Sequence, residues 1–273
     1  MYWDISRISI PVFDLKESKR FYEFLLNEDY STSTESTDEN EIFISGGNCE
    51  LRLYKLLNFL SEDNKFQSRR SYPSILIKDL SQIIENLNQK EIKFLKSIYI
   101  TNPLTPSIII QETSLNFIEL IDNKSFLNTK SNLETNKWEF HHINLESYNV
   151  RLSVNFITNF LKIKEGDWIV PEKLGDVNID KKQLSIFPTN INLGGIHINK
   201  ADFTFCLRNG FLHNPTIGGH PAFRVKDINK FIVKLEKNKI PFTDAKIYAM
   251  PNIYQIYLYD PNANIIEINQ LVT

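Results

Sequence analysis

One local pattern occurs four times in this 273-residue chain and constrains its fold more than any other feature. In each copy, apolar and polar residues alternate as in a β-strand, an Asp or Asn follows, and apolar residues then recur at helical spacing. Because Asp and Asn cap the first turn of helices, each copy predicts a strand that leads directly into a helix. The four strand-and-cap segments are 8–14, 72–79, 142–149 and 220–227.

Segments rich in β-branched and aromatic residues follow each predicted helix, with turn residues between them. The sequence therefore predicts an α+β fold of four βαβββ units, arranged as two tandem modules with mixed sheets. The first module is expected over 1–122 and the second over 137–273. The segment between them, 123–136, is polar and rich in Asn, Ser, Thr and Lys, which is typical of a linker.

Two polar insertions interrupt the repeats, at 30–41 and at 164–196. Both are expected to form surface loops, and the second is a candidate lid over a cavity. In the second module the strands that follow the predicted helices are expected at 201–207, 253–259 and 264–268.

The two modules also keep the same register along the sequence. Tyr72 and His220 are 148 residues apart, and so are Glu119 and Glu267. Each pair belongs to matching segments, because both modules end in similar runs, Asn-Phe-Ile-Glu-Leu and Ile-Ile-Glu-Ile. A gap-free match over this distance predicts that the modules are structurally equivalent.

Composition excludes several classes of function. The formal net charge of −2 provides no electrostatic basis for binding nucleic acid or a membrane surface. Neither the Gly-x-Gly-x-x-Gly motif nor the P-loop motif occurs, and no apolar run is long enough to span a membrane. Two cysteines cannot build a disulfide framework, and the N-terminus lacks the features of a signal peptide, so we expect a cytoplasmic location.

Histidine is distributed very unevenly. All five histidines lie in the second half of the chain, at positions 141, 142, 197, 213 and 220. Because histidine is the commonest metal ligand and the usual proton carrier near neutral pH, the second module is the expected location of any chemistry.

Two motifs resemble the vicinal-oxygen-chelate superfamily, which includes glyoxalases, bleomycin-resistance proteins and extradiol ring-cleaving dioxygenases. They are Asp14-Leu15 with Phe21-Tyr22 near the start, and 260–267, Asp-Pro-Asn-Ala-Asn-Ile-Ile-Glu, near the end. The turn has Ala263 where the family usually has Gly. The resemblance implies that each pair of units curves into a half-open barrel, and four units in one chain resemble the two-module dioxygenases.

In that family, metal ligands lie seven residues before the helix-capping Asp and seven residues after the Asp of the Asp-Pro turn. These places hold His142, His220 and Glu267 in the second module. In the first module they hold Arg7, Tyr72 and Glu119, so the resemblance implies a metal site in the second module alone. Two imidazoles and one carboxylate form a facial set that suits Fe²⁺, and Mn²⁺ or Zn²⁺ would also bind it.

The resemblance further implies catalytic roles for Tyr257 and His213. Tyr257 would hydrogen-bond the substrate oxygen, and His213 would take and return a proton. His141 is expected to point away from His142 on the same strand, in packing or as an outer partner. His197 is expected to be a structural or loop residue.

Three functions remain open from sequence. The first is an Fe²⁺-dependent extradiol-type dioxygenase acting on a catechol or similar vicinal diol. The second is a redox-neutral, glyoxalase-like isomerase, lyase or hydrolase that uses the same metal site. The third is a non-enzymatic protein that sequesters a small molecule. In each case the expected partner is a small molecule, and a homo-oligomer remains an alternative to a monomer.

Overall fold

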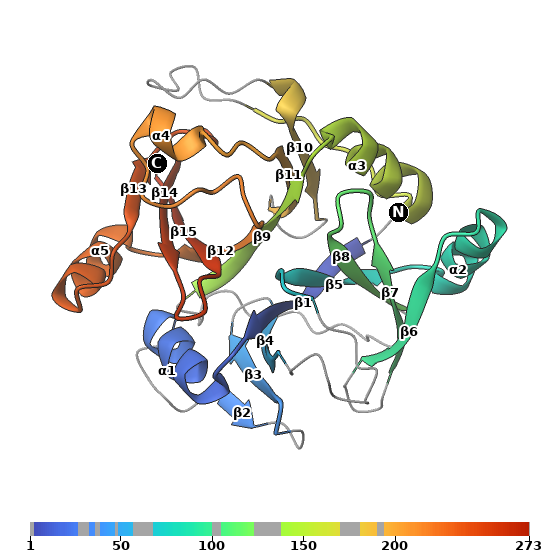
Figure 1. Ribbon diagram of the computed structural model, residues 1–273, viewed down its shortest axis with the longest axis horizontal. Helices are drawn as coiled ribbons and strands as arrows, with labels where there is room; N and C mark the ends of the chain where they lie inside the picture. The colour runs from blue at the N-terminus through green and yellow to red at the C-terminus, as the bar shows by residue number, and fades with distance from the viewer. Residues whose placement is uncertain are drawn as a thin grey trace.

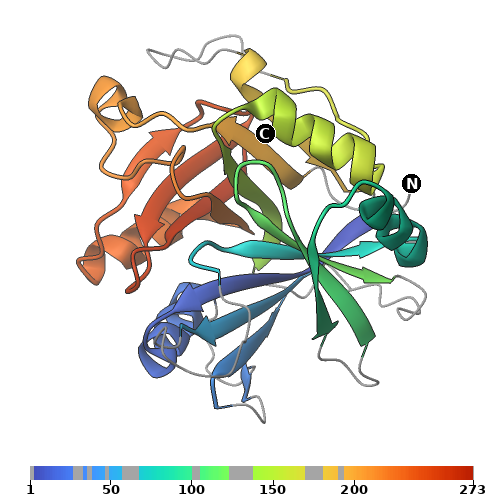
Figure 2. The ribbon, with the colours of Figure 1, turned by 45° about the vertical axis from the view of Figure 1, so that its right-hand side comes forward.

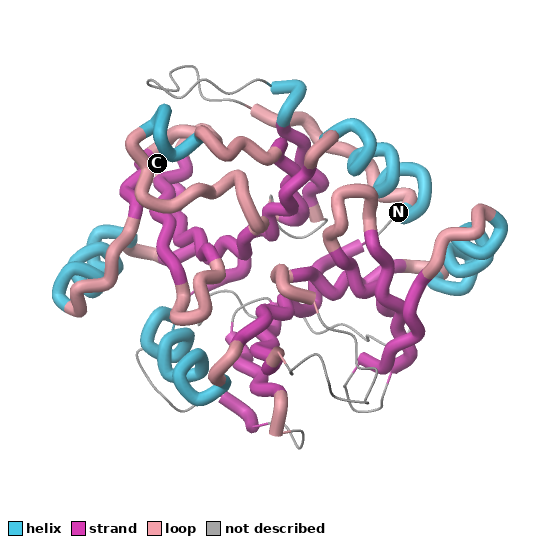
Figure 3. The backbone as a smooth tube through the Cα atoms, viewed as in Figure 1, coloured by secondary structure: helices cyan, strands magenta, loops and turns pink. Residues whose placement is uncertain are grey.

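The computed structural model describes residues 3–26, 33–35, 39–46, 49–56, 68–99, 105–122, 138–169, 181–189 and 194–272. Within them the chain forms two mixed β-sheets, one from each half of the sequence, with the main helices on their outer sides (Figures 1 and 3). The predicted linker, 123–136, lies outside the described residues. No helix in the described ranges has the length and apolar character needed to cross a membrane.

The first sheet has eight strands in the order β2-β3-β4-β1-β5-β8-β7-β6. Its centre is an antiparallel pair, β1 and β5, flanked by strands that run parallel to each of them, β4 and β8. Figure 2 shows these strands fanning out with a strong twist. The strands are β1 (Trp3–Val12), β2 (Ser33–Glu35), β3 (Glu41–Gly46), β4 (Cys49–Lys55), β5 (Tyr72–Ile77), β6 (Phe94–Tyr99), β7 (Thr105–Gln111) and β8 (Phe117–Asp122).

The second sheet has seven strands in the order β10-β11-β9-β12-β15-β14-β13. Its centre repeats that of the first sheet, because β9 and β12 are antiparallel and β11 and β15 flank them in parallel. The predicted α+β fold of paired repeat units is therefore confirmed. The strands are β9 (Trp138–Ser147), β10 (Leu184–Pro188), β11 (Gly195–Lys200), β12 (His220–Val225), β13 (Thr243–Lys246), β14 (Ile253–Tyr259) and β15 (Ile265–Leu271).

The four predicted helices begin where the caps are located. Asp14, Asn149 and Asp227 each accept a hydrogen bond from a backbone N–H three residues later, as an N-cap does. Asp79 instead adopts a left-handed conformation and makes no side-chain cap bond. The helices are α1 (Leu15–Leu26), α2 (Leu80–Gln89), α3 (Val150–Phe156, continued by the π-helical turn Ile157–Leu161) and α5 (Ile228–Lys237).

Two sequence expectations in the second module are wrong. Segment 201–207 is not a strand, because the short helix α4 (Phe205–Asn209) occupies its end and β11 precedes it. Asp202 accepts hydrogen bonds from Thr204 at the start of α4, and Gly210 ends it in a left-handed conformation. The insertion 164–196 is also not wholly a loop, because it contains β10 and the start of β11. Its parts at 170–180 and 190–193 lie outside the described residues.

A β-bulge lies at the same place in both modules. On β1, Ile5 pairs with Ile75 and Arg7 pairs with Ser74, so Ser6 is an extra residue. On β9, Phe140 pairs with Phe223 and His142 pairs with Ala222, which leaves His141 as the extra residue. A bulge interrupts the strict alternation of side chains between the two faces of a sheet.

The two modules contact each other through matching turns. The turn between β14 and β15 reaches α1, where Tyr22 donates a hydrogen bond to Asp260 at 3.0 Å. The turn between β7 and β8 reaches the end of β9, where Asn116 donates to the carbonyl of Glu146 at 2.7 Å. In Figure 1 the first turn lies beside α1 and the second beside α3. The modules therefore pack with an approximate two-fold relationship.

Candidate metal centre

The second module contains a cavity of about 330 Å³. Its polar lining includes His142 and His197 from β9 and β11, Tyr257 from β14 and Glu267 from β15. Aromatic side chains of Trp168, Phe205 and Tyr248 also line it, and Lys200, Asp202 and Arg208 contribute charged groups. A volume of this size admits a small molecule.

Glu267 is the centre of this polar group. Its Oε2 atom lies 3.3 Å from Nε2 of His220 and 3.6 Å from Nε2 of His142. The Oη of Tyr257 donates a hydrogen bond to the same oxygen at 2.9 Å. All four side chains are buried. The structure thus brings together the three residues predicted as metal ligands, with Tyr257 beside them.

Strand pairing explains why residues far apart in sequence meet here. Ala222 on β12 pairs with both His142 on β9 and Glu267 on β15, so the three strands are held side by side. His220 begins β12, directly after Gly219, which has a φ of +70°. A Cβ on residue 219 would lie 2.6 Å from the carbonyl oxygen of Asn144, so only glycine fits at this entry to the strand.

The carboxylate and imidazoles have complementary charge states. Burial alone would raise the pKa of Glu267, but His220, Asn269 and Gln255 lower it to about 2 through hydrogen bonds and charge. Burial lowers the pKa of His142 well below its ordinary value, so its imidazole is neutral at pH 7. An ionised carboxylate beside a neutral imidazole is the form in which these groups bind metal ions.

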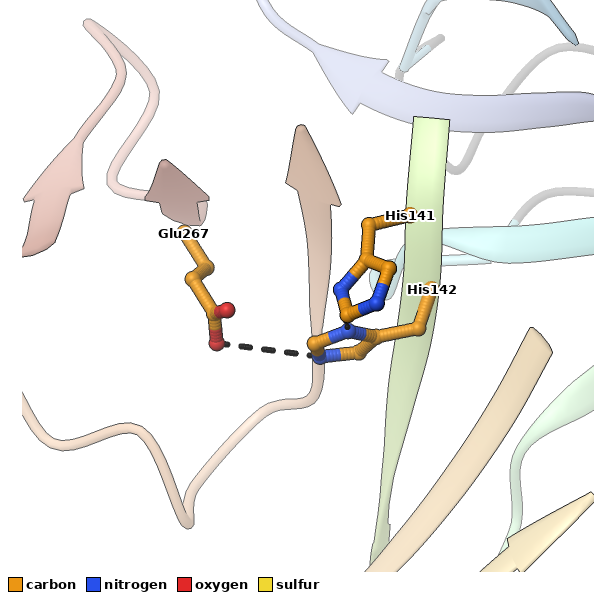
Figure 4. Close-up of side chains that lie close together, drawn as sticks. All are labelled: His141, His142 and Glu267. Atoms are coloured by element: carbon orange, nitrogen blue, oxygen red, sulfur yellow. Dashed lines mark hydrogen bonds and ion pairs between the residues drawn. The ribbon is translucent and has the colours of Figure 1, made fainter. Parts of the chain in front are cut away.

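His141 corrects the sequence expectation. It does not point away from His142, because the bulge on β9 places the two neighbouring side chains together. Their Nδ1 atoms are 3.0 Å apart, and potential ligand atoms of His141, His142 and Glu267 all lie within 4.8 Å of one another (Figure 4). Period-two alternation along a strand cannot indicate a bulge, so sequence reasoning missed this contact.

His197 also differs from expectation, because it is a buried strand residue that lines the cavity. Its ring stacks on the ring of His142, with the centroids 3.8 Å apart and the planes at 15°. Burial lowers its pKa well below the ordinary value, as do the neighbouring histidines. No sequence pattern indicated this place; strand pairing shows it, because His197 pairs with Asn144 just as Arg52 pairs with Ser9 in the first module.

The structure does not bring His213 to this centre. His213 is buried outside the cavity lining, where its Nδ1 lies 2.8 Å from the hydroxyl of Thr243 on β13. The same hydroxyl accepts a hydrogen bond from the backbone N–H of His213, and the ring packs against Tyr259. These contacts hold the side chain in place, and its acid–base role stays a prediction from resemblance.

The donor set fits a divalent cation. Ligand atoms bound about 2.0–2.2 Å from one metal lie roughly 3.0–3.6 Å from each other, and the two nitrogen-to-oxygen separations at Glu267 are 3.3 and 3.6 Å. Within the described residues, Asn144 Oδ1 and Gln255 Oε1 are buried without a hydrogen-bond partner, and both residues line the cavity. Such acceptors suit the protons of a hydroxyl or water at the site.

Comparison with known proteins supports the fold. The chain matches solved structures of the vicinal-oxygen-chelate fold along nearly its whole length, so it has the two-module form of that fold, as the motifs predicted. The sequence matches no protein-family model and no curated protein.

Three of the matching solved structures are a glyoxalase and two dioxygenases. The Mn(II)-bound glyoxalase from Novosphingobium aromaticivorans has a TM-score of 0.64 and 13% identity, over 99% of this chain and 82% of that one. The 2,3-dioxygenase LapB from Pseudomonas sp. KL28 has a TM-score of 0.65 and 12% identity, over 97% and 91%. Homoprotocatechuate 2,3-dioxygenase from Arthrobacter globiformis has a TM-score of 0.63 and 15% identity, over 97% and 79%.

Proposed function

We propose that this chain is a metal-dependent enzyme, and that its reaction is extradiol-type Fe²⁺ dioxygenation of a catechol or similar vicinal diol. The observation that carries the proposal is the placement of Glu267, which lines a cavity of about 330 Å³, beside the imidazoles of both His142 and His220. The fold likeness to named 2,3-dioxygenases supports this chemistry among those that a two-histidine, one-carboxylate set serves.

His142, His220 and Glu267 would hold the metal. A bound Fe²⁺ ion would supply Lewis-acid activation of a substrate hydroxyl and redox chemistry toward dioxygen. Because the three side chains come from neighbouring strands of one sheet, they would hold the ion at a fixed position relative to the cavity walls.

Tyr257 and His197 are the proposed catalytic residues around the substrate. Burial, with Glu267 and Tyr248 beside it, raises the pKa of Tyr257 well above its ordinary value, so its hydroxyl stays protonated and can donate to a substrate oxygen. His197 is neutral, lines the cavity and is held by stacking on His142. Its free imidazole can take a proton from a substrate hydroxyl and return it later.

The cavity walls favour a small planar substrate. Trp168, Phe205 and Tyr248 line the cavity, and aromatic faces bind a flat ring by stacking or edge contacts. Burial raises the pKa of Tyr248 above its ordinary value, and its hydroxyl lies 2.9 Å from that of Tyr257. This pair supports the orientation of the Tyr257 hydroxyl at the polar end of the cavity.

Oxygen uptake tests the proposal directly. Protein loaded with Fe²⁺ under anaerobic conditions is mixed with catechol, 3-substituted and 4-substituted catechols, and oxygen consumption and the absorbance of ring-cleaved product are followed. We expect uptake and product with at least one catechol, and a loss of both in Glu267→Gln. Tyr257→Phe and His197→Phe should lower kcat by roughly 10²–10⁴-fold, the usual contribution of positioned proton donors and acceptors.

A redox-neutral metalloenzyme is the second candidate. The comparable likeness to the Mn(II)-bound glyoxalase favours it, because the same ligand types also bind Mn²⁺. Turnover of an α-hydroxy carbonyl substrate with Mn²⁺ or Zn²⁺ and without oxygen uptake would replace the dioxygenase proposal with this one. Binding of a small molecule without metal or turnover would instead indicate the sequestering protein.

A further inference from the structure

A continuous set of hydrogen bonds connects two of the proposed metal ligands through residues that would not bind the metal. Asn269 Nδ2 lies 2.8 Å from Glu267 Oε1 and 3.0 Å from His141 Nδ1. His141 Nδ1 lies 3.0 Å from His142 Nδ1. All four side chains are buried, so the polar atoms that face one another here are shielded from bulk water.

The position of each proton follows from the amide of Asn269. Its NH₂ group, which can only donate, faces Oε1 of Glu267 and donates a hydrogen bond to that oxygen. The second N–H of that NH₂ group then points to His141 Nδ1, which must be an unprotonated acceptor. Because Nδ1 of His141 is the acceptor, the ring proton of this imidazole is on Nε2.

The proton of His142, a proposed ligand, is placed in the same way. His142 Nδ1 faces an unprotonated nitrogen at 3.0 Å, so it is stable there only as a donor. A neutral His142 with its proton on Nδ1 has a lone pair on Nε2, and Nε2 is the atom that faces Glu267 Oε2. We infer that Asn269 and His141 are positioning residues that fix the Nδ1–H tautomer of His142 and thereby keep Nε2 available to a metal ion. The inference rests on the proposed metal site.

The bulge on β9 is the structural basis of this arrangement. Without an extra residue at 141, neighbouring side chains would point to opposite faces of the sheet, and His141 could not reach His142. His141 is therefore an outer partner of the centre. Its Nδ1 lone pair is already used by donors from Asn269 and His142, so it is not free to ligate the ion itself.

Nitrogen NMR of metal-free protein labelled with ¹⁵N-histidine tests the tautomers without any metal. Ring nitrogen shifts distinguish protonated from unprotonated nitrogens, and His142→Gln and His141→Phe identify the two sets of signals. In the wild type at pH 7 we expect His142 protonated on Nδ1 and His141 on Nε2. In Asn269→Leu and His141→Phe, the proton of His142 is expected to move at least partly to Nε2, where Glu267 accepts it. A wild-type His142 with its proton on Nε2 would overturn the inference.

Mn²⁺ titration by calorimetry tests the consequence. His141→Phe keeps a ring but removes the acceptor, and we expect Mn²⁺ to bind roughly 10–100-fold more weakly, as is usual when a ligand loses its outer partner. His141→Gln supplies a carbonyl acceptor and should recover part of the affinity. Equal affinities of the wild type and His141→Phe, or no recovery in His141→Gln, would contradict the positioning role.

His197→Phe is the matched control, because His197 touches the same ring of His142 by stacking. A phenyl ring preserves the stacking, so the His142 tautomer and the Mn²⁺ affinity should stay at the wild-type values. The NMR measurement and the Mn²⁺ titration also distinguish the failure of the positioning role from the failure of the proposed metal function. Expected tautomers in a protein that binds no Fe²⁺, Mn²⁺ or Zn²⁺ would uphold the hydrogen-bond assignment and refute the metal function.

Discussion

The two modules have the same strand framework, but they surround a buried carboxylate with different partners. Strand pairing places Glu119 on β8 where Glu267 lies on β15, because Ser74 pairs with Glu119 as Ala222 pairs with Glu267. The surrounding side chains differ at nearly every matching position. The matching pairs, first module before second, are Arg7/His142, Arg52/His197, Tyr72/His220, Ser107/Gln255 and Ile109/Tyr257.

In the first module the carboxylate is enclosed by partners. Glu119 accepts hydrogen bonds from Ser74 at 2.5 Å and from Ser107 at 2.7 Å. Arg52 donates to the hydroxyl of Tyr72 at 3.0 Å and forms an ion pair with Glu41. Burial opposes the charge on Arg52, but Tyr72, Glu41 and Glu119 nevertheless hold its pKa above the ordinary value. A guanidinium is thus built into this module.

The second module replaces that guanidinium with His197, a neutral imidazole. Glu267 keeps an ionised carboxylate among imidazoles, and Arg224, which attracts it electrostatically, is shared with Glu139. A buried carboxylate is stable only when it is paired or well hydrogen-bonded. The guanidinium of Arg52 in the first module thus corresponds to the metal ion proposed for the second module.

The largest expected effect concerns the two carboxylates themselves. Glu267→Gln removes the negative ligand, so Mn²⁺ affinity should fall by more than the roughly 10–100-fold typical of losing an outer partner. Glu119→Gln changes the matching residue in the first module and should leave the affinity unchanged. Calorimetric titration of both variants makes the comparison. Equal losses of Mn²⁺ affinity in the two variants would contradict the distinction between the modules.

The guanidinium of the first module should matter chiefly for folding. Arg52→Leu leaves Glu41 and the buried Glu119 without this cation, and leaving a buried charge uncompensated costs roughly 3 kcal/mol or more. Adding Glu119→Gln to Arg52→Leu should recover part of the loss, because the uncompensated charge is gone. Urea unfolding of the single and double variants measures both effects. A double variant less stable than Arg52→Leu would contradict this role.

A smaller effect, on the pH dependence of stability, distinguishes two matching residues near the starts of β1 and β9. Asp4 pairs with Leu76, whereas its counterpart Glu139 pairs with Arg224. Burial raises the pKa of Asp4 to about 6, against a hydrogen bond from the backbone of Ile5 that lowers it. A raised carboxyl pKa means that folding favours the protonated form, so stability from this group is present below the unfolded pKa and is lost as pH rises through about 6.

Asp4→Asn should therefore raise the melting temperature above pH 6, and the gain should fade between pH 6 and pH 4. Glu139→Gln, in the second module, should give no gain because it removes a partner of Arg224. Thermal unfolding from pH 4 to pH 8 checks both variants. A gain for Asp4→Asn that is independent of pH would show that the charge of Asp4 is not its cause.

The smallest expected effect on stability lies in the two turns, β7–β8 and β14–β15, through which the modules contact each other. Leu115 and Ala263 occupy matching positions with φ angles of 68° and 63°, a left-handed conformation that favours glycine. Ala263→Gly should stabilise the fold by roughly 0.5–1 kcal/mol, because relief of strain exceeds the added entropy of the unfolded chain. Gly210→Ala, at a φ of +66° with open space around its Cβ position, is the control and should destabilise. Denaturant midpoints measure both.

The sequence was sufficient for the framework and for the meeting of His142, His220 and Tyr257 at Glu267. The gap-free spacing of 148 residues reflects real strand equivalence, since Tyr72 and His220 both begin the strands that pair with β1 and β9. Caps at Asp14, Asn149 and Asp227 are local effects, which sequence patterns represent well. The role of His142, His220 and Glu267 as ligands stays a prediction that their geometry supports.

The remaining residues depend on features that a sequence pattern does not contain. The bulge that turns His141 toward His142 is a departure from alternation, and the stacking of His197 depends on which strand lies beside β9. His213 precedes β12 closely in sequence, but Thr243 on β13 holds its ring outside the cavity lining. Side-chain direction in such segments is decided by tertiary contacts, not by spacing.

Elemental analysis of anaerobically purified protein tests the central claim most directly, namely that only the second module has a metal site. The wild type and Tyr72→Phe, which alters the matching position of the first module, should each contain one equivalent of divalent metal per chain. His220→Ala should lose that metal while keeping its folded circular-dichroism spectrum. Stoichiometric metal retained in His220→Ala, or metal lost in Tyr72→Phe, would contradict the account.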